Sequence, residues 1–279
     1  MLPTLLTLAL GAVVASVQLN AQDEDVRAWV ASQVKPRNIT VDSVVNLTPW
    51  PRGSQPNLFV ILATGSKPSR SPGVTEFDFG FVILAKSQTP RELRGPQLLA
   101  LFAPEDTTPD QDWPISVSAR RLSSPLSIDV APFQIRKGEF AFGVRYGTDD
   151  LGNKGGHAYE VLSLFRYHDA KLSEIFRAVT WAYERSMEDT CNSDMVIIAN
   201  PPRAGDESGY FTLTSKHKRS YSGDTRNPPS AYFEGPHSIA VKSCEPFREF
   251  EKTNVHTWNA ARGVYLDQDG KWLFPEALD

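Results

Sequence analysis

The pentapeptide Phe-Val-Ile-Leu-Ala occurs twice in the chain, at residues 59–63 and again at residues 81–85. Each copy is a continuous apolar run, which is typical of a strand buried on both faces or of a strand in a tightly packed sheet. The repeat records either a duplicated strand or a coincidence in a chain rich in these residues. No regular period of the kind that marks a full propeller accompanies it.

Alternating patterns surround these two runs. Aromatic residues alternate with Asp78 and Gly80 over residues 77–81, and apolar and small or polar residues alternate over residues 140–146. Alternation of this kind places the apolar side chains on one face of a half-buried strand. About a dozen strands of either kind can be placed, at spacings typical of sandwiches and small propellers. The sequence therefore predicts a mainly β protein with antiparallel sheets, in a sandwich or a small propeller-like arrangement.

Two segments also fit a helix. Near the start, Asp25 can cap a short helix that Pro36 ends, with an apolar stripe formed by Val26, Trp29, Val30 and Val34. Residues 172–183 fit helical spacing too, but they are rich in strand formers and follow the strand pattern of residues 159–167 across a short turn. We favour a β-hairpin there.

The N-terminus predicts export. Residues 5–17 are apolar, small residues follow as far as Ala21, and the first charges are Asp23, Glu24 and Asp25. This is the order of a cleaved signal peptide. A retained membrane anchor is the alternative, because a charge-free stretch of this length just spans a bilayer. The expected organisation is a signal peptide at residues 1–21, followed by a single β-rich domain at residues 22–279 in the periplasm or outside the cell.

The two cysteines, Cys191 and Cys244, agree with export. In an oxidising compartment we expect them to form a disulfide, whereas two unrelated buried thiols are the alternative. The formal net charge of −4 gives no electrostatic case for nucleic-acid binding. Hydrophobic residues make up 41% of the chain and charged residues 22%, which is ordinary for a globular protein.

No catalytic or metal signature is present. The chain lacks a His-Glu-x-x-His helix, a nucleophile elbow, a phosphate-binding loop and a dinucleotide fingerprint. We interpret each of the five histidines as a loop or strand-edge residue, namely His157, His168, His217, His237 and His256. No cofactor and no metal ion is predicted.

Two acidic turns resemble calcium sites superficially. The Gly-rich stretch at residues 147–156 contains Asp149 and Asp150, whose carboxylates suit a hard cation, but a hairpin loop between two strands explains it more simply. Asp267-Gln-Asp269-Gly270 opens like an EF-hand loop and lacks the later acidic ligand. We interpret it as a tight hairpin turn.

The one concentrated basic run is Lys216-His217-Lys218-Arg219. Such a run is usually a solvated loop or a strand end, and the longest irregular stretch of the chain is expected from about Lys218 to Pro236. The alternative is a contact with an acidic partner surface, which nearby Tyr221 supports, because tyrosine is favoured at protein interfaces.

Four segments of the chain occur together in a recognisable order. They are residues 141–145 (Ala-Phe-Gly-Val-Arg), the Gly-rich loop, residues 160–166 (Glu-Val-Leu-Ser-Leu-Phe-Arg) and residues 269–272 (Asp-Gly-Lys-Trp). This combination resembles a group of functionally uncharacterised exported bacterial proteins with repeated antiparallel strands. The resemblance covers less than a third of the chain. It implies a hairpin at residues 158–184 and a location in the cell envelope, and it implies no catalytic residue.

These observations favour a binding protein over an enzyme. The expected function is that of an exported, soluble binding or accessory protein of the cell envelope or extracellular space, with a protein-binding inhibitor as one form. The expected partner is another exported protein, and no membrane span is expected after signal cleavage. The alternatives are an extracellular hydrolase, whose carboxylates or histidines meet only in the fold, and a structural envelope protein.

Overall fold

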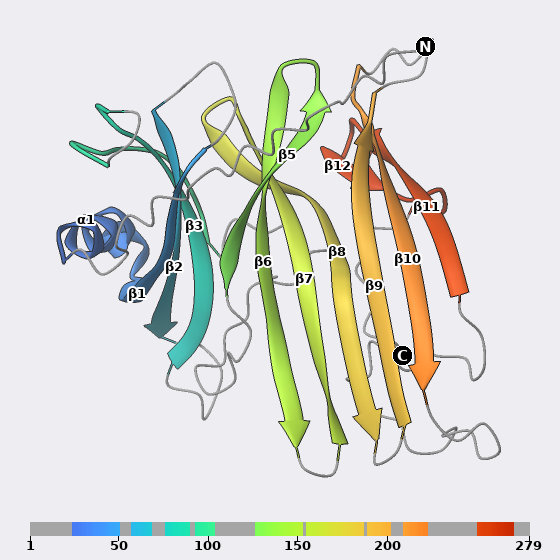
Figure 1. Cartoon of the computed structure of the whole chain (residues 1–279). Coiled ribbons are helices and arrows are strands. Elements are labelled where there is room, and N and C mark those ends of the chain that lie inside the picture. The colour runs from blue at the N-terminus through green and yellow to red at the C-terminus, as the bar shows by residue number, and fades with distance from the viewer. Residues whose placement is uncertain are drawn as a thin grey trace, which may run out of the picture.

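The computed structural model describes residues 24–50, 57–68, 76–89, 93–103, 126–152, 155–186, 189–201, 209–222 and 250–270 (Figure 1). One short helix and a short 3-10 turn precede a series of antiparallel strands, which confirms the predicted fold class. The elements are α1 (Glu24–Val34), η1 (Lys35–Arg37), β1 (Thr40–Pro49), β2 (Leu58–Pro68), β3 (Glu76–Lys86), β4 (Gln97–Phe102), β5 (Ser127–Arg136), β6 (Glu139–Gly152), β7 (Gly155–His168), β8 (Lys171–Ser186), β9 (Asp189–Asn200), β10 (Thr212–Ser222), β11 (Phe250–Asn259) and β12 (Val264–Leu266).

The two copies of the pentapeptide are hydrogen-bonded neighbours in a four-stranded sheet of order β1-β2-β3-β4. The antiparallel register pairs Phe59 with Ala85 and Ala63 with Phe81, so that Ile61 lies opposite Ile83 at the centre. Each copy is at most 1% exposed at every position. A strand that is apolar on both sides needs a cover on both sides, and both faces of this sheet are covered.

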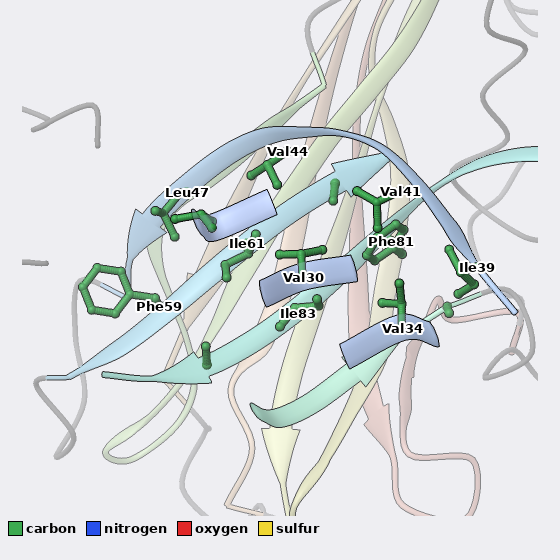
Figure 2. Close-up of a cluster of buried hydrophobic side chains, with 14 of the residues drawn as sticks. Val30, Val34, Ile39, Val41, Val44, Leu47, Phe59, Ile61, Phe81 and Ile83 are labelled. Atoms are coloured by element: carbon green, nitrogen blue, oxygen red, sulfur yellow. The ribbon is translucent and has the colours of Figure 1, made fainter. Parts of the chain in front are cut away.

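Helix α1 covers one face of the four-stranded sheet. Val30 and Val34 are fully buried and point from the helix toward Ile61, Phe81 and Ile83 (Figure 2). The helix begins at Glu24, so that Asp25 lies in its first turn. It ends at Val34, and the 3-10 turn that contains Pro36 follows. The predicted helix and its buried stripe are therefore confirmed, with Trp29 only partly buried. The expectation that Asp25 caps the helix is wrong, because Asp25 lies inside it.

The other face of this sheet packs on the eight-stranded sheet, whose order is β12-β11-β10-β9-β8-β7-β6-β5. Aromatic rings join the two layers: Phe102 of β4 meets Phe165 of β7 edge-on at 5.0 Å between centroids, and Phe165 stacks on Phe142 of β6. The two sheets thus form a sandwich, with α1 as an outer layer (Figure 1).

Strands β7 and β8 form the hairpin that we favoured over a helix. Their register runs from His168, which pairs with Lys171, to Gly155, which pairs with Ser186. The turn residues Asp169 and Ala170 both have a left-handed backbone, with φ of 49° and 59°. The spacing that fits a helix belongs in fact to a bulged strand.

Strands β9 to β12 pack back on the layer formed by β5 to β8. Leu213 of β10 and Tyr265 of β12 share a buried cluster with Ile135, Leu164 and Phe176. The amide of Phe211 donates a hydrogen bond of 2.8 Å to the carbonyl oxygen of Ile135, so the start of β10 returns to the end of β5. One face of β10 therefore belongs to the core.

Candidate functional site

Strands β9, β10 and β11 place two rows of residues side by side on their outward face. In the first row Ile198 lies opposite Thr214, and Thr214 lies opposite Val255. In the second row Val196, Lys216 and Thr253 occupy the corresponding positions. Paired residues of antiparallel strands point to the same side of a sheet, so these six side chains share one surface. We call it the outward face.

The outward face is apolar and open to solvent. Val196 is 60% exposed, and Ile198 and Val255 are each 39% exposed. Among the described residues one more large hydrophobic side chain, Val45 on β1, is comparably exposed, at 36%. Next to these aliphatic groups, Lys216 is exposed and makes no ion pair with the described part of the chain. The face thus combines adjacent apolar side chains with an exposed ammonium group.

The basic run of the sequence contributes to this face in part. All of residues 216–221 lie within β10 rather than in a loop, and the strand continues to Ser222. Residues 216–219 are paired with both β9 and β11, whereas residues 220–221 are paired with β9. Lys216 and Lys218 are both exposed, two residues apart. The side chains of His217, Arg219 and Tyr221 lie outside the described part of the structure, as does most of the irregular stretch expected up to Pro236.

Sequence reasoning missed the aliphatic half of the outward face. Residues 195–199 read Met-Val-Ile-Ile-Ala, a continuous apolar run that resembles residues 59–63. Such a run indicates burial on both sides, yet β9 is covered on one side at this point. In the structure the neighbouring strand β10 alternates, with Leu213 and Ser215 buried and Lys216 exposed. The charge of Lys216 is the part of this pattern that the sequence shows.

A hydrogen-bonded serine–histidine pair lies behind the outward face. Ser215 Oγ and His256 Nε2 are 2.9 Å apart, both residues are buried, and the ring of Phe176 meets the imidazole edge-on. Burial lowers the pKa of His256 to about 4, although the Asp267 carboxylate opposes the shift. The expectation that each histidine lies in a loop or at a strand edge is therefore wrong for His256, which belongs to the core.

The chemistry of this pair is limited by its position. A serine within hydrogen-bond distance of a neutral histidine is the arrangement of an activated nucleophile. Ser215 has no exposed surface, however, and His256 is 1% exposed. A substrate atom cannot reach either side chain in this structure, so the pair acts as a satisfied polar contact within the core.

Two carboxylates converge at another place, on the guanidinium of Arg145. Asp129 Oδ2 accepts a hydrogen bond of 2.8 Å from Arg145 Nε, and Glu160 accepts one from Arg145 Nη1 and another from the hydroxyl of Thr180. A pair that serves as acid and base in glycoside hydrolysis needs room for a sugar between its members. Here one arginine fills that place, which makes the cluster an ion-pair network.

The remaining predicted sites have simple outcomes. The Gly-rich stretch is the β6–β7 hairpin, in which Gly152 pairs with Gly155, and the turn at Asp267 is closed by a hydrogen bond from the amide of Gly270. No group of metal-ligating side chains occurs within the described residues.

Cys191 lies on β9, but its side chain and all of Cys244 lie outside the described part of the structure, so their disulfide stays a prediction.

One open groove occurs beside α1. It is lined by residues of α1 and β1, and Arg27 crosses it by donating a hydrogen bond of 3.3 Å from Nη2 to the carbonyl oxygen of Val41.

In the ranges that the structure describes, no helix has the length and apolar character needed to cross a membrane.

No protein-family model, no curated protein and no solved structure matches the chain. The resemblance of residues 141–145 and 160–166 to exported bacterial proteins therefore remains a hypothesis. A functional conclusion has to rest on the geometry of the molecule.

Proposed function

We propose that the chain is an exported, soluble binding or accessory protein of the cell envelope or extracellular space, which binds another exported protein through the outward face of β9–β11. The observation that carries this proposal is the clustering of Val196, Ile198 and Val255 around Lys216. Three of the four exposed large hydrophobic side chains in the described part of the chain lie on this one surface.

The chemistry of the face suits a protein partner. Adjacent exposed apolar side chains mark interaction surfaces, and each aliphatic group gains on the order of 1 kcal/mol when its remaining exposed surface is removed from water. The register makes the face regular, with β-branched residues at Val196, Ile198, Thr214 and Val255, and a second sheet or a helix packs well against such a surface.

The charge of the exposed lysines further limits which partner surfaces fit this face. Lys216 is exposed and forms no ion pair with other described residues, so a partner that places a carboxylate opposite it gains complementarity without first breaking an ion pair to that part of the chain. Lys218 differs, because the register places it between Asp194 and Glu251. The expected partner is thus an apolar protein surface with acidic residues along one side. An exported enzyme that this chain inhibits is one form of such a partner.

The proposal is tested by quantitative affinity capture from the extracytoplasmic fraction of the producing cells. The baits are the mature protein, a Val196→Asp variant and a Val45→Asp variant. The last is a matched control, because Val45 is also an exposed valine on a strand but lies on the other sheet. We expect one stoichiometric protein with the mature chain and with Val45→Asp, and its loss with Val196→Asp. Equal recovery by all three baits, or no enriched protein with any, would contradict the proposal.

A further inference from the structure

A second candidate site lies where two turns of the eight-stranded sheet meet the segment that leads into β10. The β5–β6 turn carries Arg136 and Glu139 as a backbone pair, and the β7–β8 turn begins at His168. Glu139 joins these two turns, because its Oε1 accepts a hydrogen bond of 2.5 Å from Arg166 and lies 3.8 Å from Nδ1 of His168. The start of β10 completes the group through the backbone bridge between Tyr210 and Arg136.

An aromatic stack forms the base of this site. Tyr210 and Trp258 are nearly parallel, at an interplanar angle of 11° with 4.2 Å between ring centroids. The guanidinium carbon of Arg166 lies 5.3 Å from each of the two centroids. Arg166 is also neutralised by Glu139, and its side chain is only 12% exposed. Both of its interactions are therefore internal to the protein.

Arg136 differs from Arg166 in one respect that matters for binding. Its guanidinium carbon lies 5.4 Å from the centroid of the Tyr210 ring, so it is held in place by the same stack. Gly209 lies next to it, with a φ of 66° that favours glycine, and a β-carbon there would lie 3.6 Å from Arg136 Nε. Yet Arg136 is exposed and has no carboxylate partner among the described residues.

The described residues of the β5–β6 and β7–β8 turns carry a net positive charge, although the chain as a whole is acidic. Four permanent cations lie at these turns with two carboxylates, in a protein whose formal net charge is −4. The cations are Arg136, Lys137, Arg166 and Lys171, and the carboxylates are Glu139 and Asp169. A positioned guanidinium in a locally positive field is a receptor for an oxyanion, since its donors match two oxygens of one group.

We propose that Arg136, positioned by Tyr210 and Gly209, binds an oxyanion of a ligand, that is, a carboxylate or a phosphate group. This site is separate from the outward face and does not depend on it. The stack fixes the guanidinium before binding, so less side-chain freedom is lost when the anion arrives. The shared chemistry of the two ligand classes is a pair of oxygens that accept parallel hydrogen bonds.

The test is an NMR titration of the arginine Nε–Hε resonances in the full mature chain. The probes are inorganic phosphate and acetate, added separately at constant ionic strength with chloride as the balancing anion. We expect a saturable shift of the resonance that is missing from the Arg136→Gln spectrum. In the variants that lack this resonance, binding is followed by the backbone amide of Gly209, which lies next to Arg136. Saturation by phosphate identifies a phosphate-bearing ligand, saturation by acetate a carboxylate ligand, and either result supports the site.

Two variants make this test specific. Arg136→Gln should weaken binding about tenfold or more, because hydrogen bonds to a charged group are lost. Lys137→Gln removes the same charge one residue further along and should weaken binding less than about threefold, since an exposed charge acts through screened solvent. Arg136→Lys, which keeps the charge and loses the fork, should resemble Arg136→Gln. No saturable shift with either anion, or equal losses in the Arg136→Gln and Lys137→Gln variants, would overturn the proposal.

Discussion

Strands β2, β3 and β9 each contain a continuous apolar run, but the runs are covered to different extents. Residues 59–63 and 81–85 are covered by α1 on one side and by the eight-stranded sheet on the other. Residues 195–199 are covered on one side, and Val196 is left 60% exposed. The comparison shows that an apolar run indicates how many faces can be buried, whereas the rest of the fold decides how many are.

The largest expected effect concerns a buried ion pair in β8. In β8, Arg177 donates hydrogen bonds to Glu174, including one of 2.7 Å from Nε, and both residues are buried. Arg177→Met should lower the free energy of unfolding by about 3–5 kcal/mol, because it leaves the Glu174 carboxylate buried without its cation. Urea unfolding measures this loss.

Two further variants sharpen that result. The double variant Glu174→Leu with Arg177→Met should regain most of the loss, since no buried charge remains. Lys216→Met, the same kind of substitution on the outward face, should change the free energy of unfolding by less than about 0.5 kcal/mol. A loss below about 1 kcal/mol for Arg177→Met would mean that water reaches the pair.

A matched pair of isoleucines tests the comparison itself. Ile61 is fully buried and Ile198 is 39% exposed, and each lies on a strand that is paired with an antiparallel neighbour. Ile61→Ala should cost about 2–5 kcal/mol through lost burial and a residual cavity. Ile198→Ala should cost less than about 1 kcal/mol, as at other exposed positions. Comparable losses in urea unfolding would show that the outward face is covered within the same chain.

The inward side of β10–β11 should respond to pH. The pKa of His256 is about 4 in the folded chain, because of burial, against an ordinary value of 6.5. Between these values the unfolded chain binds the proton more tightly than the folded chain, so stability falls as the pH is lowered from about 6.5 toward 4. The loss approaches about 3 kcal/mol at 1.36 kcal/mol per unit of pKa difference.

The control for this prediction is His256→Gln, which keeps a side-chain partner for Ser215 and cannot take up the proton. Unfolding measured at pH 7, 5.5 and 4 should show a smaller decline for this variant than for the parent chain. Identical declines would assign the pH dependence to other groups.

Much of the fold could be predicted because local periodicity carries it. The alternation over residues 140–146 and the apolar runs at 59–63 and 81–85 predict strands, and the structure has strands at all three places. The pairing of the two runs with each other could not be predicted, since register depends on contacts between separate segments. The same limit hid His256, whose burial depends on contacts with Ser215 and Phe176 of other strands.

The buried ion pair was hidden for a different reason. Glu174 and Arg177 are three residues apart, and in a regular strand they would point to opposite faces. A register shift between Leu164 and Phe165 of β7 marks a bulge in β8 at this point. The bulge places both side chains on one side, and a bulge leaves no clear mark in the sequence.

The outward face, too, could be predicted only in part from the sequence. The sequence identified Lys216 and Lys218 as unusual, because a cluster of basic residues is visible without a structure. It did not identify Val196, Ile198 and Val255 as exposed, because exposure of an aliphatic residue depends on which strand lies over it. The outward face forms only where β9, β10 and β11 lie side by side, and β11 is far from the other two strands in the chain.

The central claim is that the outward face of β9–β11 contacts another protein. The most direct measurement is site-specific photocrosslinking in the producing cells, with a photoreactive amino acid at position 196 or, as the control, at position 45. The account predicts one adduct of discrete mass from position 196 and none of that mass from position 45. No adduct from position 196, or the same adduct from both positions, would contradict it.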